Sequence, residues 1–559
     1  MTDSSGIAMA ETNPETLGQQ TGNGVARKVA LQALRVPDAT SSVIEYHSAG
    51  RLVIIGPGSE AVAVATQLLD SLPAIAIVDP DTEAKRPEMD DRIVFLHADI
   101  DRVEGHLGDF HIHLRDRGTQ TLELGPILGR GWPHIDMVLD LSATPSFQAD
   151  ILPPGYFASR GDDGRLAGLL EEIPGMIGEF EKPRYFRYDS TICAHNRNQC
   201  TACTRCIDAC PTQAIRSIGE MIEVDPYLCQ GGGTCAAVCP SGAIRYVYPG
   251  LADTLSLIRQ LLKQYVQADG QQARVVFVEE ARRGPLYQQL ATLEENLIPI
   301  GLDELGAVDL TLMLNTLAYG ARQVIVVTSE TTAPRIQETL HQQQALANEF
   351  LESMGDTSQR IVIVTQPQLA DVAVPNDEET QPPAATYASF DDKRNMIHLA
   401  LEHLYQHARQ QPEVLALSAQ APFGEVRVNT QACTLCMACT GVCPTGALLA
   451  GNELPQLKFI ENNCVQCGLC EQTCPESAIT RHQQYRFESE ARRARRVLHE
   501  EEPYHCVACG KPFATRQMVE HMRGKLAGHW MFDNDRALRR LSMCEDCRVA
   551  DMWDEEHRA

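Results

Sequence analysis

Fifteen of the twenty cysteines fall in two blocks whose spacing is typical of iron–sulfur ligands. Each block opens with a C-x2-C-x2-C-x3-C-P run, and further cysteines follow. This is the bacterial two-cluster pattern, in which three close thiolates hold one cluster and the fourth ligates its neighbour. Because such clusters accept and donate single electrons, the spacing predicts an electron-transfer protein. The first block contains Cys200, Cys203, Cys206, Cys210, Cys229, Cys235 and Cys239, and the second Cys433, Cys436, Cys439, Cys443, Cys464, Cys467, Cys470 and Cys474.

The second block is complete and predicts two 4Fe-4S clusters. Soft thiolates at two-residue gaps can converge on one cluster from a tight loop, and the following proline helps to turn the chain. Zinc on the same thiolates is an alternative that this spacing disfavours. We assign one cluster to Cys433, Cys436, Cys439 and Cys474, and the other to Cys443, Cys464, Cys467 and Cys470.

The first block lacks one cysteine. Cys200, Cys203, Cys206 and Cys239 can hold a complete cluster, whereas the second set has only Cys210, Cys229 and Cys235. Gly232 stands where its middle cysteine belongs. Three alternatives are open for the incomplete set: a 3Fe-4S cluster, a 4Fe-4S cluster with three cysteines, or no cluster. An open iron could bind substrate, but an ordinary cluster of altered potential is the favoured interpretation.

Two further residues lie just before the first block. Cys193 is either a small buried apolar residue or a ligand, or alternative ligand, of the nearby cluster. His195 is expected to be a packed or surface histidine rather than a ligand.

Four cysteines near the end of the chain form two C-x2-C pairs: Cys506 and Cys509, then Cys544 and Cys547. Four thiolates in this arrangement suit a structural, tetrahedral zinc site, with a single iron as the alternative. The separation of the pairs predicts a helical insertion between them. His521 and His529 lie in that insertion but are not assigned as ligands.

A glycine-rich turn near residue 56 could hold a nucleotide or flavin. This turn, with Gly56, Gly58 and Ala61, lies between an expected strand and the helix that follows it. Asp79 stands at the end of the next expected strand. In dinucleotide-binding proteins this order places the pyrophosphate at a helix N-terminus and an acid on the ribose. A purely structural turn is the favoured alternative, because no second mononucleotide half is visible.

The elements that would position these residues form a multidomain α/β plus α+β fold. Residues 49–150 read as a Rossmann-like α/β unit, with strands expected at 52–55, 74–78, 93–96, 110–114 and 137–141 and a helix at 59–72. Residues 270–366 alternate strands, clearest at 275–278, 323–327 and 361–364, with helices, which predicts a parallel sheet with helical cover. Ferredoxin-like modules are expected at 185–250 and 424–486, and a zinc-ribbon-like tail at 503–553.

The remaining segments are expected to connect these domains. Residues 1–48 read as a disordered tail and lead-in, because Ser, Thr, Glu, Gly and Gln dominate their start. Residues 367–390, with three prolines among acidic residues, read as a linker. Arg492, Arg493, Arg495 and Arg496 lie on an expected helix at 488–498 and are read as a solvated face.

The net charge of −26 argues against nucleic acid as a partner and suits basic patches on redox proteins. No uncharged apolar run is long enough for membrane insertion, and the start lacks the features of a secretory signal. With cysteines at metal spacings, a cytoplasmic protein is expected.

The cysteine segments, taken in order with Ile192-Cys193-Ala194-His195 and Cys506-Val-Ala-Cys509-Gly-Lys-Pro-Phe, carry a resemblance. The chain resembles the large bacterial multi-cluster 4Fe-4S binding proteins associated with formate dehydrogenase gene clusters. The resemblance spans about 50–550 and implies an electron-carrier or accessory role around formate oxidation. The central domain is faintly similar to a small iron–sulfur subunit of hydrogenase and heterodisulfide reductase complexes, although it contains no cysteine.

The favoured function is an electron conduit that relays single electrons to or from a partner such as formate dehydrogenase, without substrate chemistry of its own. A nucleotide- or flavin-dependent oxidoreductase and a maturation factor for formate dehydrogenase remain alternatives. No Ser-His-Asp, paired-carboxylate or P-loop constellation is present to define an enzyme.

Overall fold

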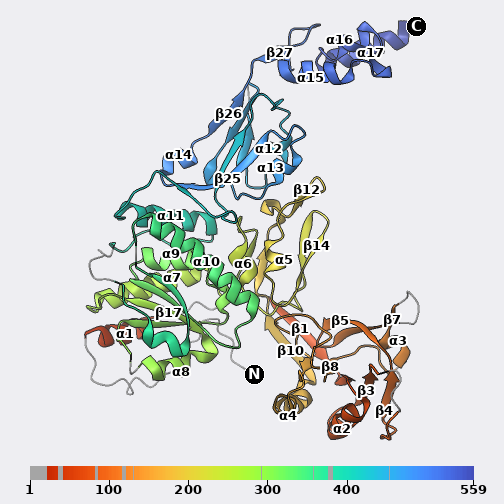
Figure 1. Cartoon of the computed structure of the whole chain (residues 1–559), viewed down its shortest axis with the longest axis vertical. Coiled ribbons are helices and arrows are strands. Elements are labelled where there is room, and N and C mark those ends of the chain that lie inside the picture. Colours follow the sequence, from red (N-terminus) through yellow and green to blue (C-terminus); the bar gives the residue numbers. More distant parts are fainter. Residues whose placement is uncertain are drawn as a thin grey trace.

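The computed structural model describes residues 22–34, 42–81, 86–115, 121–129, 131–290, 293–356, 358–375, 382–451 and 454–558. These residues form a mixed α/β multidomain protein with parallel sheets. We call the ferredoxin-like parts that begin near residues 185 and 424 module 1 and module 2. In Figure 1 module 1 lies between the N-terminal α/β unit and the central domain. Module 2 and then the tail extend beyond them. Among the described residues, no helix is long and apolar enough to cross a membrane.

The N-terminal unit contains a five-stranded parallel sheet in the order β4-β3-β2-β8-β9. Its strands are β2 (Arg51–Ile55), β3 (Ala74–Asp79), β4 (Ile93–His97), β8 (Met137–Asp140) and β9 (Tyr156–Ala158), with α2 (Gly58–Leu68) following β2. Apolar clusters cover both faces of this sheet. The expected strand at 110–114 exists as β6 (Asp109–Arg115), but it belongs to a separate antiparallel sheet with β5 (Ile100–His106) and β7 (Thr121–Glu123).

The central domain contains a four-stranded parallel sheet in the order β18-β17-β19-β20. Buried Val, Ile and Leu fill β17 (Arg274–Glu279), β18 (Leu297–Leu302), β19 (Gln323–Thr328) and β20 (Ile361–Thr365). The helices are α7 (Leu251–Gln267), α8 (Glu280–Leu290), α9 (Leu310–Ala318), α10 (Pro334–Ser353) and α11 (Lys393–Gln406). Helices α7, α9, α10 and α11 contribute to one continuous apolar core, which confirms the predicted parallel α/β domain.

Parts of the two expected connecting segments, 1–48 and 367–390, are ordered and packed among the described residues. Within 1–48, α1 (Gly22–Ala33) packs on α7 through buried Ala26 and Ala30, and β1 (Val43–Ser48) pairs with β10 (Gly178–Pro183). Residues 1–21 and 35–41 lie outside the described residues. The described part of 367–390 is docked rather than free: Ala385 is buried, and its N–H donates to the carbonyl of Ala318.

Module 1 is built from short paired strands and two short helices. β11 (Phe186–Tyr188) pairs with β16 (Ile244–Tyr246), β12 (Asn196–Arg197) with β13 (Cys200–Thr201), and β14 (Ile215–Ile218) with β15 (Met221–Val224). Helices α5 (Arg205–Asp208) and α6 (Thr234–Val238) contain the block cysteines Cys206 and Cys235, respectively.

Module 2 has the same short helices, α12 (Ala438–Val442) and α13 (Leu469–Thr473). Its sheets are β21-β25-β22 and β23-β24-β26, formed by β21 (Val414–Ala416), β22 (Gly424–Val428), β23 (Leu448–Ala450), β24 (Gln456–Phe459), β25 (Ile479–Arg486) and β26 (Arg496–Glu500).

The helix expected at 488–498 is wrong beyond its first turn. Only α14 (Ser489–Arg493) is helical, and Arg496 begins β26. Arg492 is 1% exposed, because it donates to Asn462, Glu402 and backbone carbonyls of the preceding strand. This arginine therefore belongs to the core of module 2 and not to a solvated face.

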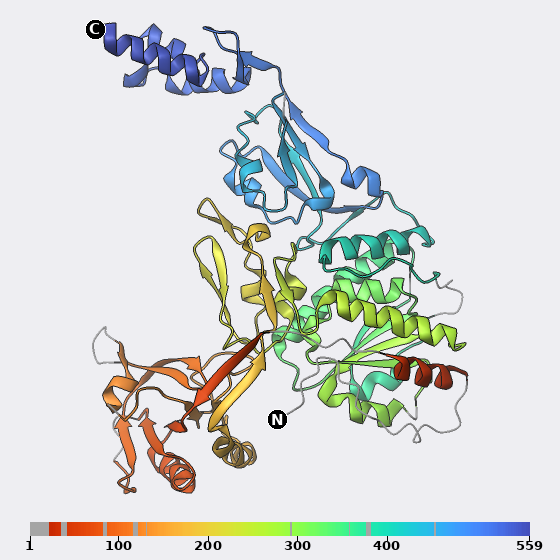
Figure 2. The same ribbon diagram turned by 180° about the vertical axis from the view of Figure 1, so that it is seen from behind.

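The tail comprises β27 (Pro503–His505), β28 (Pro512–Thr515), α15 (Arg516–Leu526), α16 (Asp535–Arg540) and α17 (Glu545–Arg558). The predicted helical insertion between the two cysteine pairs is confirmed by α15 and α16. Figure 2 shows from behind that the tail extends from the end of module 2 away from the N-terminal unit.

Candidate metal centres

Two cavities in module 2 are each lined by one of the predicted sets of four cysteines. Set D, defined as Cys433, Cys436, Cys439 and Cys474, surrounds a cavity walled by Leu435, Leu457 and Ile479. Set C, defined as Cys443, Cys464, Cys467 and Cys470, surrounds a second cavity walled by Phe459, Leu469 and Arg481. Four thiols around an apolar hollow suit an iron–sulfur cluster in both ligand number and donor type.

Backbone geometry in the cysteine loops turns N–H groups toward sulfur. Residues between the cysteines, including Leu435, Met437, Gln466 and Gly468, have positive φ angles of 52–91°. The N–H of Ala447 donates to Cys443 Sγ at 3.2 Å, and that of Ala478 donates to Cys474 Sγ at 3.3 Å. The side chain of Gln466 donates to Cys464 Sγ at 3.4 Å. Such bonds stabilise thiolates and tune the potential of a cluster.

Burial raises the pKa of several thiols in these sets. Burial, with the neighbouring thiols adding, raises the pKa of Cys439 to about 12, and burial likewise raises the pKa of Cys464 to about 12. In module 1, burial raises the pKa of Cys203 to about 11. Since a metal ligand must be a thiolate, these groups are suited to a bound cation that compensates their charge.

Module 1 brings its thiols together in two sets. Set B is defined as Cys203, Cys206 and Cys239, and set A as Cys210, Cys229 and Cys235. Mutual charge interactions within each set add to burial in raising the pKa of Cys206 and of Cys235. Cys200 lies in the β12–β13 hairpin, where it packs with Cys203 and Cys467 against Ala194, Val442 and Leu469 and not in the cluster that holds Cys206 and Cys239.

The glycine at the missing cysteine of set A has a packing role. A Cβ on Gly232 would face Pro211 Cγ at 3.0 Å and Ile336 Cδ1 at 3.9 Å. Its carbonyl oxygen would lie only 2.0 Å from a Cβ on Gly306 in the Leu305–Ala307 turn of the central domain. The three-glycine loop therefore lies directly against the central domain, and a larger residue at 232 would press on Pro211.

The two modules meet at an apolar contact between sets B and C. Ala194 of module 1 forms a buried cluster with Val442 and Leu469 of module 2, and Cys203 and Cys467 pack against it from either side. The Cys467 thiol is near enough to Cys203 to contribute to its raised pKa.

Sequence reasoning missed two basic residues that hold the modules together. At the N-terminus of α11, Lys393 Nζ donates to the carbonyls of Ala236 and Ala237 in module 1 and pairs with Asp309 at 3.1 Å. Arg394 donates to the carbonyls of Asn462 and Cys464 in module 2. No spacing rule marks these two residues, because they act through backbone carbonyls that only the folded chain presents.

The four tail cysteines converge. The sulfurs of Cys506, Cys509, Cys544 and Cys547 all lie within 4.8 Å of one another. Although burial opposes it, backbone N–H groups of Cys544, Ala508 and Cys509 lower the pKa of Cys506 to about 6. This set suits a tetrahedral ion such as zinc.

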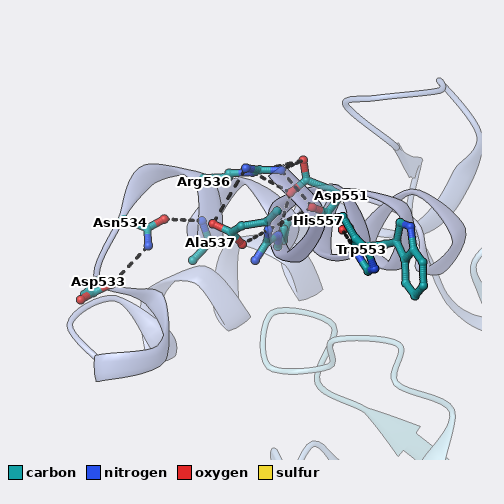
Figure 3. Close-up of polar contacts among 9 residues, drawn as sticks. Asp533, Asn534, Arg536, Ala537, Asp551, Trp553 and His557 are labelled. Carbon is teal, nitrogen blue, oxygen red and sulfur yellow. Dashed lines mark hydrogen bonds and ion pairs between the residues drawn. The ribbon is translucent and has the colours of Figure 1, made fainter. Parts of the chain in front are cut away.

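The helices beside these cysteines are held by ion pairs. Arg536 of α16 binds Asp551 of α17 (Figure 3), and Arg540 of α16 pairs with the same carboxylate. Of the two histidines in the insertion, His529 caps a short helix by accepting from the N–H of Met531, and His521 lies 3.5 Å from Glu476.

At the Gly56 turn, the structure gives the glycines and Asp79 internal partners. Asp79 is 1% exposed, and its carboxylate accepts the N–H groups of Gly58 at 3.0 Å and Asp81 at 2.9 Å. A Cβ on Gly58 would lie 2.7 Å from Asp79 Oδ2, which explains the glycine without a ligand. Ala61 is buried in the core beneath the sheet. Nucleotide or flavin binding here stays a prediction.

Comparison with known proteins agrees with the two modules. Residues 199–243 match the model of a 4Fe-4S dicluster domain, and residues 425–475 match the model of a second such domain. The chain carries two 4Fe-4S dicluster domains. It is also similar to the indolepyruvate oxidoreductase subunit IorA of Pyrococcus horikoshii, at 42% identity over 57 residues. That match covers 10% of this chain and 9% of the relative, so it concerns a local segment.

Proposed function

We propose that this protein relays single electrons through four iron–sulfur centres arranged in the order A, B, C and D. The observation that carries the proposal is the contact of Cys203 and Cys467 with one apolar cluster, which brings sets B and C together across the module boundary. Bound at these thiols, 4Fe-4S clusters would supply one-electron redox chemistry.

The order of the sets follows from their neighbours. Cys206 of set B contributes to the raised pKa of Cys235 in set A, and Cys439 of set D contributes to that of Cys470 in set C. Each module thus supplies one adjacent pair, and the B–C contact joins the pairs. The composition of set A is proposed to be a 3Fe-4S or a three-cysteine 4Fe-4S cluster, since Gly232 cannot supply a ligand.

Apolar side chains would exclude water from the path between sets B and C, and basic side chains would fix the distance between the modules. Val442 and Leu469 are at most 1% exposed and exclude water between sets B and C. Lys393 and Arg394 bind one module each from consecutive positions of α11 and so fix the distance between them.

A partner oxidoreductase is proposed at an end of this path. Formate dehydrogenase is the candidate from the family resemblance, and the local similarity to an indolepyruvate oxidoreductase subunit supports a redox complex of this general kind. The test is reduction of the anaerobic protein by formate with catalytic formate dehydrogenase, followed by visible bleaching. Bleaching by NADH alone would instead favour the nucleotide-dependent alternative.

The relay itself is tested by EPR of dithionite-reduced, anaerobically purified protein. We expect about fifteen or sixteen cluster irons per chain and spin coupling between sets B and C. The double variant Cys467→Ala with Cys470→Ala should abolish that coupling, whereas Cys436→Ala, which alters set D, should preserve it. A protein without cluster iron, or a set B signal that is identical in both variants, would contradict the relay.

A further inference from the structure

We propose that Cys193, and not Cys200, completes set B with Cys203, Cys206 and Cys239. The inference rests on the proposed function only in assuming that set B holds a cluster. It reassigns the ligand that the regular spacing of the first block predicts.

Cys193 belongs to the same apolar cluster as two of the set B thiols, Cys206 and Cys239, in the core of module 1. It follows a single 3₁₀ turn, Ser190–Ile192. The start of this turn is fixed by Asp189, whose carboxylate accepts the N–H of Thr191 and whose own N–H donates to the carbonyl of Ala243. The position of Cys193 is therefore set by the module fold and not by a free loop.

His195 holds this segment beside Cys203. Its carbonyl accepts the N–H groups of Ala202 at 2.8 Å and Cys203 at 3.4 Å. Its ring Nδ1 lies 2.8 Å from the carbonyl of Cys203, and Nε2 lies 2.7 Å from Ser217 Oγ. The histidine is 2% exposed, so both ring nitrogens are used in positioning. This makes His195 a positioning residue for Cys193 relative to Cys203.

Cys200 faces another neighbour. It pairs with Arg197 in a hairpin whose turn residues Asn198 and Gln199 have φ angles of 52° and 64°. It packs, as Cys203 does, against Val442 and Leu469 of module 2, whereas Cys206 and Cys239 pack in the cluster that holds Cys193. In module 2 the corresponding first cysteine, Cys433, lines the cavity with its set, so the hairpin in module 1 accounts for the difference.

The test compares Cys193→Ala with Cys200→Ala in the full chain, purified anaerobically. We expect Cys193→Ala to lose about one to four irons per chain or to gain an oxidised 3Fe-4S EPR signal, and Cys200→Ala to keep the wild-type iron and spectrum. Iron loss in Cys200→Ala, or wild-type iron in Cys193→Ala, would overturn the assignment.

Thiol alkylation of the wild-type holo protein keeps the test independent of folding of the variants. Iodoacetamide should modify Cys200 but not Cys193, and Cys193 should become reactive once iron is chelated. The reverse pattern would contradict the assignment. Absence of cluster iron from the wild type would instead refute the proposed function, which makes the two failures distinguishable.

Discussion

Gly233 shows how one residue couples a candidate metal site to a neighbouring domain. Its φ angle is 74°, and a Cβ there would lie 2.5 Å from the backbone nitrogen of Ala307. A backbone atom cannot move aside as the end of a flexible side chain can. The position therefore requires glycine for two reasons, its conformation and the close approach of the central domain.

Replacing Gly233 by alanine should loosen set A. Gly219→Ala is the matched control, because Gly219 has the same φ of 74° and no atom within 4 Å of its Cβ position. We expect about 1 kcal/mol of destabilisation for Gly219→Ala and at least about twice that for Gly233→Ala. The stability of both variants is measured by urea unfolding, monitored through the loss of cluster absorbance. Equal unfolding midpoints for Gly219→Ala and Gly233→Ala would show that the contact with Ala307 is not tight.

Glu304 predicts a pH dependence of stability in the central domain. Burial, with Glu279 and Asp303 adding, raises its pKa from 4.5 to about 7. The folded state thus binds more protons than the unfolded state between these values, so stability falls as pH rises toward 7 and levels above it. A loss of about 2 kcal/mol is expected between pH 5 and pH 8.

The Glu304→Gln variant should reduce this dependence, because the amide does not titrate, while Glu280, whose pKa burial also raises to about 7, still does. Glu352→Gln, on the exposed end of α10, should leave it unchanged. Urea midpoints at both pH values measure the effect, and a wild-type slope in Glu304→Gln would assign the dependence to another group.

At the scale of elements, the N-terminus of α11 carries the contact between modules. Arg394 places a guanidinium against the carbonyl of Cys464, and its charge favours the more negative, reduced state of a cluster at set C.

Arg394→Gln should therefore lower the potential of set C by tens of millivolts. Arg259→Gln removes an arginine that binds Thr386 in the central domain and should leave that potential unchanged. Redox titration monitored by EPR distinguishes the two. An unchanged reduction potential of set C in Arg394→Gln would mean that Arg394 only links the modules.

The elements that sequence analysis predicted well are those whose side chains repeat with a clear period. Strands β2, β3, β17, β19 and β20 are nearly continuous runs of Val and Ile. Strand β18 was missed because Pro299 and Gly301 interrupt its apolar pattern, although all six of its residues are buried. Helix α1 was missed because its glycines and polar residues are typical of a tail, and only packing on α7 stabilises it.

The candidate metal sites likewise include parts that the sequence predicted and parts that it did not. Spacing alone grouped the cysteines of sets C and D as the cavities do, because short loops leave few arrangements. Spacing could not separate Cys193 from Cys200, since the choice depends on a hairpin that contacts module 2. The roles of Gly232 and Arg492 were equally hidden, because both depend on residues distant in sequence.

At the scale of the whole molecule, the tail touches module 2 near set D. The hydroxyl of Thr515 donates to the carbonyl of Thr434, next to Cys433, while the four tail thiols form their own site beyond β28. The tail site should therefore load independently of the iron centres.

Cys544→Ala should remove about one zinc per chain and leave cluster iron intact. If the tail site of the wild type holds iron and no zinc, the zinc assignment is wrong and the site is a single-iron centre. Metal analysis of purified protein measures both metals at once, and a parallel loss of iron in Cys544→Ala would show that set D depends on the tail.

The apolar contact of Cys203 with Val442, Leu469 and Cys467 joins residues that are made far apart in time. At roughly 5–20 residues per second, set B leaves the ribosome on the order of ten seconds or more before Leu469 is synthesised. During that interval its module 2 side faces solvent and dissolved oxygen. Biogenesis of the protein in air therefore carries a risk that the finished molecule does not, and slower translation of the central domain should lower the yield of intact set B.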